Sequence, residues 1–492
     1  MRCLIRADAS AQIGTGHIAR CLTLADALRA LGAQVSFACV LLDGHLQARI
    51  EQAGYPLFGL EPQPGEDWQG EIARLSALLP AGQVFDWVIV DHYALDARWQ
   101  QAARGFARQV AVIDDLGDRA QAADLLLNQN FNASSALYAA LLPATARRLL
   151  GPRFALIRPA FARPPKPLAA HGRRVLVSFG GFDVAGMVLK TLQALAGLEG
   201  LQVTCVAGLQ HVQREALQAL CASRADWQLH DYLEDLPTHM AAADLFIGAG
   251  GGTTWERALL GLPSLCVCVA DNQRANAEAL ARAGVHLYLG EAAQVTLAAL
   301  REAVALLLGN APLRQSFASH SRALVDGLGA RRVAVALCGA GLQLRRAEAR
   351  DAQLLFDGRN ADAVRRWSLE SQPLSWERHL LWLTATLHNP QRLLLIAEAG
   401  DGPVGMLRYD RLTAQRGRVS IYLFEGRFGL GWGRALLARG EQAVVAAWPE
   451  LEVIEAQVLP DNQASLALFS AAGFSRGECL FERSLKDSQH EF

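Results

Sequence analysis

The chain has 492 residues, and at ~150 residues per domain this length predicts about three domains. It is 51% hydrophobic and 19% charged, with 47 basic against 48 acidic residues. This composition excludes a disordered chain, and the balanced charge argues against nucleic acid as a partner.

The sequence shows no sign of a membrane anchor or a metal cluster. The longest apolar run, Leu259 to Ala270, is interrupted by Pro263 and is shorter than the ~20 residues that span a bilayer. The first residues enter a strand pattern directly, without the pattern of a leader peptide. The 9 cysteines are scattered without metal-ligand spacing. We therefore expect a cytoplasmic protein with reduced, mostly buried thiols and no membrane insertion.

The first part of the chain alternates strands and helices. Residues 3–5 predict a strand, residues 9–16 a loop of small residues, and the next segment an amphipathic helix that begins near His17. Similar units follow up to residue 160. This alternation is typical of a parallel sheet covered on both faces, and it predicts a first α/β domain over residues 1–160.

A stretch rich in proline and arginine, residues 158–167, separates this domain from a second series of strands that begins at Val175. The second series predicts another doubly wound α/β domain, over residues 161–343. After that point arginine and tryptophan become frequent, and the pattern predicts an α+β unit over residues 344–492.

The segment Gly14-Thr15-Gly16-His17 lies between a predicted strand and a predicted helix. Its N–H groups and the positive end of the helix can face a phosphate. An ordinary glycine turn and a dinucleotide-binding loop, G-x-G-x-x-A with Ala19, are the alternatives. In the dinucleotide motif the first glycine follows the strand almost directly, whereas about eight residues separate Ile5 from Gly14. The spacing therefore favours a phosphate loop of another kind.

His17 is the candidate general base. At the start of a helix the dipole disfavours the protonated imidazole, so the neutral ring can accept a proton from water. A lone histidine is more often structural, but its position next to a glycine loop favours a catalytic role.

Several motifs resemble the UDP-sugar hydrolases of pseudaminic acid biosynthesis, which remove UDP from UDP-2,4-diacetamido-2,4,6-trideoxy-β-L-altropyranose. The resemblance begins with I-R-A-D-A-S, G-T-G-H and R-C-L-T-L-A at residues 5–25. It continues in order through V-D-H-Y (90–93), I-D-D-L (113–116), G-P-R-F-A-L (151–156) and S-F-G-G (178–181). It implies a glycosyltransferase-B architecture, in which two Rossmann-like domains face a cleft, with His17 as the catalytic base.

The acidic motifs leave alternatives open. With the resemblance, Tyr93 is a candidate for orienting the sugar or the water, and His92 is a weaker one. Without it, Asp91 could cap the next helix and Tyr93 could merely pack. Asp114 and Asp115 are interpreted as a cap and a salt-bridge partner rather than as an acid/base pair.

The run I-G-A-G-G-G-T-T-W-E, residues 247–256, again places glycines between a strand and a helix. Its N–H groups can bind a pyrophosphate, and Glu256 can accept both ribose hydroxyls. The run resembles the nucleotide-binding segment of glycosyltransferase-B enzymes that use UDP sugars. Helix–sheet packing is the alternative for the glycines, and turn chemistry for the amides that follow. The expected substrate-binding residues are Gly14, Gly16, Arg20, Gly250, Gly251, Thr253, Glu256, Asn272, Gln273 and Asn276.

The sequence contains no D-x-D triplet that would hold a divalent metal on the diphosphate, so we expect metal-free chemistry. Water deprotonated by His17 would attack the anomeric carbon with inversion, while helix N-termini stabilise the departing UDP. A glycosyltransferase would bring an acceptor alcohol to the same place, and a non-catalytic sensor would only bind the nucleotide sugar.

The C-terminal unit carries a third glycine loop, R-F-G-L-G-W-G-R-A-L-L at residues 427–437. This loop resembles the acetyl-coenzyme A signature of GNAT-fold N-acetyltransferases, and residues 462–474 resemble the closing helix of that family. Asn462, at its start, could equally be a helix N-cap. The resemblance implies acetyl-CoA as co-substrate, held by Gly431, Gly433, Arg434, Ala435 and Asn462.

This unit departs from the family at two positions. Phe428 stands where a Gln or Arg usually opens the loop, and Phe469 where a tyrosine often protonates the thiolate, so we assign no general acid. The segments around Trp367 and Trp376 resemble the N-terminal helices of acetyltransferases that modify the 4-amino group of UDP-amino sugars. The alternative is that these tryptophans belong to the hydrophobic core. The sequence thus predicts a bifunctional enzyme that acetylates a UDP-linked amino sugar and then hydrolyses UDP from the product.

Overall fold

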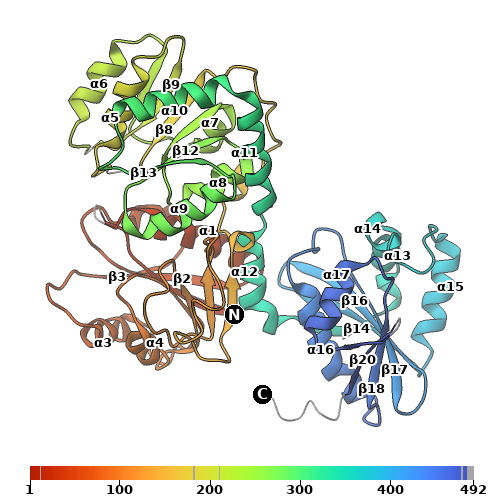
Figure 1. The fold of residues 1–492 in the computed structure, drawn as a ribbon. Coiled ribbons are helices and arrows are strands. Elements are labelled where there is room, and N and C mark those ends of the chain that lie inside the picture. Colours follow the sequence, from red (N-terminus) through yellow and green to blue (C-terminus); the bar gives the residue numbers. More distant parts are fainter. Residues whose placement is uncertain (11–12, 181–182, 210, 478–479, 485–492) are drawn as a thin grey trace. The chain divides into compact units, whose positions relative to one another are not determined.

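A computed structural model describes the chain except residues 11–12, 181–182, 210, 478–479 and 485–492 (Figure 1). Gly181 of the S-F-G-G motif and Cys479 therefore lie outside the described residues. The chain divides into two compact units. The larger contains Arg2–Ala27 and Gln34–Val333, and the smaller contains Met1, Leu28–Ala33 and the described chain from Ala334 onward.

The larger unit begins with a seven-stranded parallel sheet in the order β3-β2-β1-β4-β5-β6-β7. The strand order reverses between β1 and β4, which is where ligands bind in open α/β sheets. Ala7 pairs with Asp91 at this point. The strands are β1 (Arg2–Ala7), β2 (Gln34–Val40), β3 (Leu57–Leu60), β4 (Phe85–Asp91), β5 (Ala107–Ile113), β6 (Leu125–Asn128) and β7 (Arg147–Leu150).

Apolar runs make these strands the core of the first sheet. Val88 and Val90 of β4 are fully buried against Leu75 and Trp99, which come from two covering helices. The glycine loop leads from β1 into the helix that carries His17. The helices are α1 (Gly16–Ala30), α2 (Gln47–Gln52), α3 (Trp68–Leu78) and α4 (Ala97–Ala103).

The second sheet of the larger unit is parallel and six-stranded, in the order β10-β9-β8-β11-β12-β13. Its strands are β8 (Arg174–Ser178), β9 (Gln202–Val206), β10 (Trp227–His230), β11 (Leu245–Ala249), β12 (Ser264–Cys268) and β13 (Leu287–Glu291). Its helices are α5 (Met187–Leu195), α6 (Arg214–Ala222), α7 (Leu236–Ala242), α8 (Thr253–Leu260), α9 (Asp271–Arg282), α10 (Leu297–Gly309) and α11 (Ala311–Leu324). Helix α12 (Gly329–Cys338) contains the division between the two units, at Val333 and Ala334.

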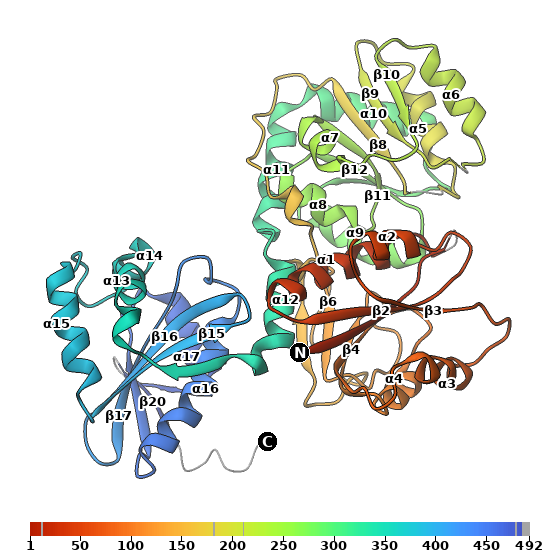
Figure 2. The ribbon, with the colours of Figure 1, turned by 180° about the vertical axis from the view of Figure 1, so that it is seen from behind.

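Alternate residues of this second sheet face opposite helix layers. Val175 and Val177 pack with Leu192 of α5, whereas Leu176 between them packs with Trp255 of α8. Both faces are therefore covered, as a parallel sheet requires (Figure 2).

The smaller unit contains a mixed seven-stranded sheet in the order β14-β15-β16-β17-β18-β20-β19. Its strands are β14 (Gln343–Arg346), β15 (Arg392–Ala399), β16 (Gly402–Arg411), β17 (Arg416–Leu423), β18 (Val453–Gln457), β19 (Ser475–Arg476) and β20 (Leu480–Ser484). Its helices are α13 (Ala352–Asn360), α14 (Asp362–Arg365), α15 (Trp376–Leu387), α16 (Trp432–Ala447) and α17 (Gln463–Ala471).

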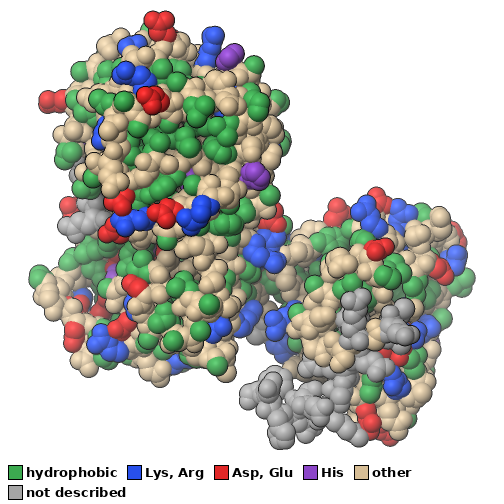
Figure 3. Space-filling model, viewed as in Figure 1, with side chains coloured by type: hydrophobic (Ala, Val, Ile, Leu, Met, Phe, Trp, Pro, Cys, Tyr) green, Lys and Arg blue, Asp and Glu red, His purple; other side chains and the backbone are tan. Residues whose placement is uncertain are grey.

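Acidic and basic side chains are interspersed on the face shown in Figure 3, in keeping with a net charge of -1. The described cysteines are free, and all except Cys338 are buried. Within the described ranges, no helix combines the length and the apolar character needed to cross a membrane.

Candidate active site

His17 is held by a carboxylate from the neighbouring strand. It lies in the first turn of α1, is 6% exposed, and its Nδ1 is 2.6 Å from Asp91 Oδ1 at the end of β4. Adjacent strands β1 and β4 bring the two residues together although 74 positions separate them. A proton on Nδ1 donated to Asp91 leaves the Nε2 lone pair to accept a proton from a ligand.

Arg20 fixes the same carboxylate. Its Nε donates to Asp91 Oδ2 at 2.7 Å and its Nη2 to Asp91 Oδ1 at 2.6 Å. Burial alone would raise the pKa of Asp91, but Arg20 and His17 hold it well below its usual range. Asp91 is therefore charged at neutral pH.

Arg20, an expected substrate-binding residue, is occupied by two carboxylates of the protein. Its third contact is from Nη1 to Asp115 Oδ2, at 2.7 Å. Burial would lower the pKa of Arg20, but Asp115 and Asp91 raise it well above its usual value. The structure thus places Arg20 in the support of the histidine, one helical turn beyond it.

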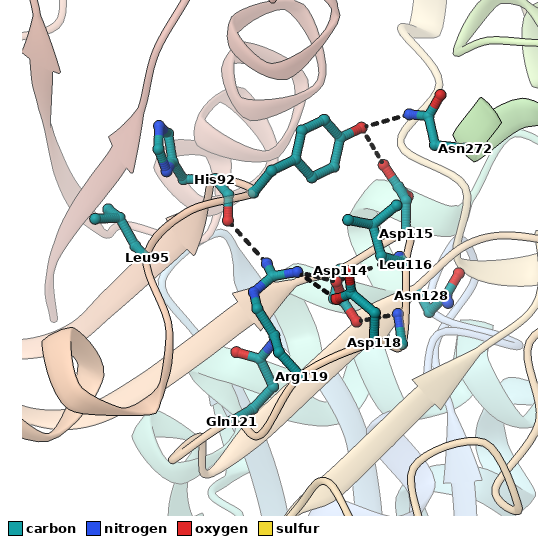
Figure 4. Close-up of polar contacts among 12 residues, drawn as sticks. His92, Leu95, Asp114, Asp115, Leu116, Asp118, Arg119, Gln121, Asn128 and Asn272 are labelled. Carbon is teal, nitrogen blue, oxygen red and sulfur yellow. Dashed lines mark hydrogen bonds and ion pairs between the residues drawn. The ribbon is translucent and has the colours of Figure 1, made fainter. Parts of the chain in front are cut away.

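Tyr93 contacts both His17 and Asp115. Its ring meets that of His17 edge-on, with centroids 4.7 Å apart and an interplanar angle of 79°. Its hydroxyl is 3.5 Å from Asp115 Oδ2 and accepts a hydrogen bond from Asn272 Nδ2 at 3.0 Å (Figure 4). Burial and the charge of Asp115 raise the pKa of Tyr93 to about 12, so the hydroxyl stays protonated at neutral pH.

His92, the weaker candidate, has both ring nitrogens engaged by the protein. Nε2 lies 3.3 Å from Asp8 Oδ2, and Nδ1 accepts from the Ala94 N–H at 3.1 Å. Asp8 in turn binds Arg6, which is fully buried and also pairs with Glu71. His92 therefore belongs to a buried polar network beside the site.

Asp114 and Asp115 have different surroundings. Asp114 accepts hydrogen bonds from the Gly117 N–H at 2.9 Å and the Tyr138 hydroxyl at 2.9 Å, so it stabilises the turn that follows β5. Asp115 faces Arg20 and Tyr93 instead, and the structure makes it part of the cluster around His17. No spacing in the sequence distinguishes these two neighbours.

The second glycine segment joins β11 to α8. Gly252 precedes the first helical residue, Thr253, and no side chain caps this helix end. Added Cβ atoms at Gly251 and Gly252 would meet at most one described atom, Gln273 Nε2 at 3.7 Å, so the space in front is open. The Thr254 and Trp255 N–H groups donate to the Gly251 and Gly252 carbonyls, so the N–H groups that precede them are the ones that can attract an anion at this helix start. Gly250 itself donates to Gln273 Oε1 at 3.3 Å.

Glu256 lies within the first turn of α8 and is bound by an arginine that sequence analysis did not single out. Arg158 donates to Glu256 Oε1 from Nε at 3.2 Å and from Nη2 at 3.1 Å. Burial raises the pKa of Glu256, while Arg158 opposes the rise. Arg158 belongs to the proline-rich linker, residues 158–167. The basic residues of this linker are the one feature of the sequence that could have indicated a partner for Glu256.

The amides of α9 connect the two parallel sheets. Asn276 Oδ1 accepts from the Phe131 N–H at 2.8 Å, and Asn272 reaches Tyr93. Asn276, an expected substrate-binding residue, is 5% exposed and is occupied by this contact. Gln273 contacts the second glycine segment, because its Oε1 accepts the hydrogen bond from the Gly250 N–H.

The third glycine loop leads from β17 to α16. Gly431 has a φ of 97° at the N-cap of α16, a conformation that favours glycine, and no side chain caps this helix. A Cβ at Gly433 would lie 3.0 Å from Leu468 Cδ2, so glycine here lets α17 approach α16. Arg434 is exposed and Ala435 is half-buried in the same turn.

Asn462 caps α17, because its Oδ1 accepts from the Ser465 N–H at 3.1 Å. Arg427 does not substitute for the missing residue at Phe428: its side chain donates to Asp401 and to the Pro403 carbonyl. Among the described residues, β17 and β18 pair only over Arg416–Arg418 and Val453–Glu455, so the two strands separate toward the glycine loop.

The described residues hold no group of three or more His, Cys, Asp or Glu side chains that could bind a metal ion.

Comparisons with known proteins identify two domains. Residues 175–325 match the glycosyltransferase family 28 C-terminal domain, and residues 342–475 match the acetyltransferase (GNAT) domain. The UDP-2,4-diacetamido-2,4,6-trideoxy-beta-L-altropyranose hydrolase of Campylobacter jejuni is 26% identical over 284 residues, which are 58% of this chain and 97% of that protein. The uncharacterized protein MJ1062 of Methanocaldococcus jannaschii is 20% identical over 494 residues, or 97% of each chain.

The solved structure of the glycotransferase of kitacinnamycin has a TM-score of 0.51 at 19% identity, and covers 68% of this chain and 97% of its own. This likeness confirms the expected fold of the larger unit. The chain therefore joins a unit with the glycosyltransferase-B fold, whose second half matches the glycosyltransferase family 28 C-terminal domain, to a unit that matches the acetyltransferase (GNAT) domain.

Proposed function

We propose that the chain is a bifunctional nucleotide-sugar enzyme. The larger unit hydrolyses UDP from UDP-2,4-diacetamido-2,4,6-trideoxy-β-L-altropyranose, and the smaller unit acetylates the 4-amino group of the preceding UDP-amino sugar. The observation that carries the hydrolase assignment is the contact between His17 and Asp91, beside an open glycine loop. The similarity to the Campylobacter jejuni hydrolase supports the choice of sugar.

The mechanism uses His17 as general base. Its Nδ1 proton stays on the hydrogen bond to Asp91, and Nε2 accepts a proton from water as the water oxygen attacks the anomeric carbon. The bond from that carbon to the UDP oxygen breaks with its electron pair remaining on UDP. Attack opposite the leaving group inverts the anomeric centre.

The leaving group is stabilised by the second glycine segment. The N–H groups at the start of α8 supply hydrogen bonds to the diphosphate where its charge develops. Glu256, held on one oxygen by Arg158, keeps acceptor capacity for the ribose hydroxyls. These roles require no group beyond those of the described chain.

The acetyl transfer rests on the GNAT domain. The uncapped start of α16, with Gly431 and Gly433, fits a coenzyme pyrophosphate, and the separation of β17 from β18 leaves room beside it. The sugar amine attacks the thioester carbon of acetyl-CoA, and the C–S bond breaks with its electron pair on the coenzyme A sulfur. The proton that the amine loses passes through solvent to this thiolate. Phe469 is buried and has no proton to give to the thiolate.

Product analysis tests both activities. Purified protein given the UDP-amino sugar and acetyl-CoA is expected to release UDP and the free diacetamido sugar, with heavy oxygen from labelled water on the sugar. NMR of the first product reports the inversion. His17→Phe is expected to lower the hydrolysis rate by about 10²- to 10⁴-fold and to leave acetylation intact. Absence of both products from the wild type would contradict the proposal.

A glycosyltransferase is the second candidate, because the family 28 match and the glycotransferase likeness concern that fold. Comparing UDP release with and without acceptor alcohols separates the two. A transferase would release UDP only with an acceptor, and the label from water would not appear on the sugar.

A further inference from the structure

Arg257 is a buried cation beneath the second glycine segment. It is 2% exposed, and its guanidinium carbon lies 4.5 Å from the centroid of the Phe246 ring. Its Nη2 donates to the Ala249 carbonyl at 3.2 Å and to the Thr254 hydroxyl at 2.7 Å, and its Nε to the Thr253 carbonyl at 3.3 Å. None of these three acceptors is a carboxylate.

The charge of Arg257 lacks a matching anion. Its Nη1 is buried and has no hydrogen-bond partner in the part of the chain that the structure describes. Two acidic groups act on the guanidinium: Cys266, through its charge and a side-chain hydrogen bond, and Glu256, through its charge. Burial raises the pKa of Cys266 to about 11, so this thiol is neutral at pH 7, and Glu256 is bound to Arg158.

An uncompensated buried charge is unfavourable for folding, so its retention calls for another benefit. The two carbonyls that Arg257 holds, at Ala249 and Thr253, bracket the segment Gly250–Gly252. That segment faces open space on the side of Gly252. The open space beside Gly252 therefore has room for the missing anion.

We propose that Arg257 supplies the fixed positive charge that a bound nucleoside diphosphate completes. Arg257 acts through the glycine segment, as a positioning residue: it orients the carbonyls and adds a positive potential, but it does not touch the phosphates. This inference rests on the proposed function and adds a specific source of affinity for the diphosphate. A unit charge acting over several ångströms of partly buried protein changes affinity by about tenfold.

Titration of the full chain with UDP tests this role. Arg257→Gln and Arg257→Met remove the charge, and both are expected to weaken UDP binding about tenfold. Arg257→Lys keeps the charge and is expected to bind UDP within about threefold of the wild type.

Arg314 provides a matched control. It is also fully buried, and it donates to the carbonyls of Leu307, Leu308, Ala169 and Ala170. Its charge interacts with that of Asp244, which directly precedes the first residue of β11. Arg257 instead contacts Ala249, the last residue of β11. Arg314→Gln is therefore expected to leave UDP affinity unchanged.

The outcomes separate this inference from the function on which it rests. Wild-type binding by the Gln and Met variants would overturn the role of Arg257. An equal loss in the Lys variant would also overturn it, because the guanidinium would then act only as a brace. If the wild type fails to bind UDP at all, the proposed function itself is wrong.

Discussion

Arg20 binds Asp91 through a two-point contact, with Nε 2.7 Å from Oδ2 and Nη2 2.6 Å from Oδ1. This fork fixes the plane of the carboxylate. Because His17 Nδ1 meets the same Oδ1, the orientation of the imidazole depends on the arginine as well.

Asp91→Asn is expected to lower kcat for UDP release by about 10²- to 10⁴-fold. An asparagine amide that donates toward His17 favours the wrong tautomer, with its proton on Nε2. Steady-state kinetics with the UDP-sugar measures this loss, and KM should change far less than kcat.

UDP affinity is the control for Asp91→Asn, because the second glycine segment belongs to the other parallel sheet. Titration with UDP should give the wild-type affinity. A variant that keeps more than a tenth of wild-type kcat would show that Asp91 does not direct the histidine.

The sequence predicted the strand and helix pattern well but not the partners of its polar residues. Apolar runs such as residues 245–247 are local signals, and they placed both parallel sheets. The pairing of His17 with Asp91 depends on the adjacency of β1 and β4, which no local pattern encodes. The amide of Asn276 is predicted to meet the ligand, and in the structure its Oδ1 accepts from the Phe131 N–H, a contact that requires the packing of one sheet domain on the other.

Arg20→Gln is expected to show a stability loss that depends on pH. The depressed pKa of Asp91 means that its charge stabilises the folded chain above its unfolded pKa of ~3.9. That contribution is lost as the pH falls below ~4, because the unfolded chain then binds the proton more readily. Without Arg20 the depression is smaller. The melting temperature of the variant should therefore lie furthest below that of the wild type near neutral pH.

The pH dependence of the two melting temperatures tests whether Arg20 acts through the charge of Asp91. The difference between wild type and Arg20→Gln should narrow between about pH 5 and pH 3. A difference that stays constant over this range would mean that Arg20 stabilises by packing and not through the charge of Asp91. Arg98→Gln, on an exposed pair with Asp96, should shift the melting temperature little.

Tyr93→Phe is expected to lower kcat by about tenfold without changing the shape of the pH profile below about pH 10. The hydroxyl joins Asn272 to Asp115, and its loss leaves the Asn272 amide without this partner. The pKa of Tyr93 is raised to about 12, so the tyrosine does not titrate in the working range. A profile whose alkaline limb disappears in the variant would instead assign a titrating role to Tyr93.

Gly433→Val is expected to abolish acetyl transfer and leave UDP release unchanged, because it acts only in the smaller unit. The added Cβ would lie 3.0 Å from Leu468 Cδ2 and 3.2 Å from Cδ1, and the further methyl groups of valine would push α17 away from α16. Overpacking of this kind costs about 1–3 kcal/mol. Leu468→Ala removes the obstructing atoms, so the double variant should regain part of the acetyl transfer measured with acetyl-CoA and the UDP-amino sugar. If the double variant stays inactive while its melting temperature recovers, the defect lies in the N–H groups at the start of α16 rather than in the contact between the two helices.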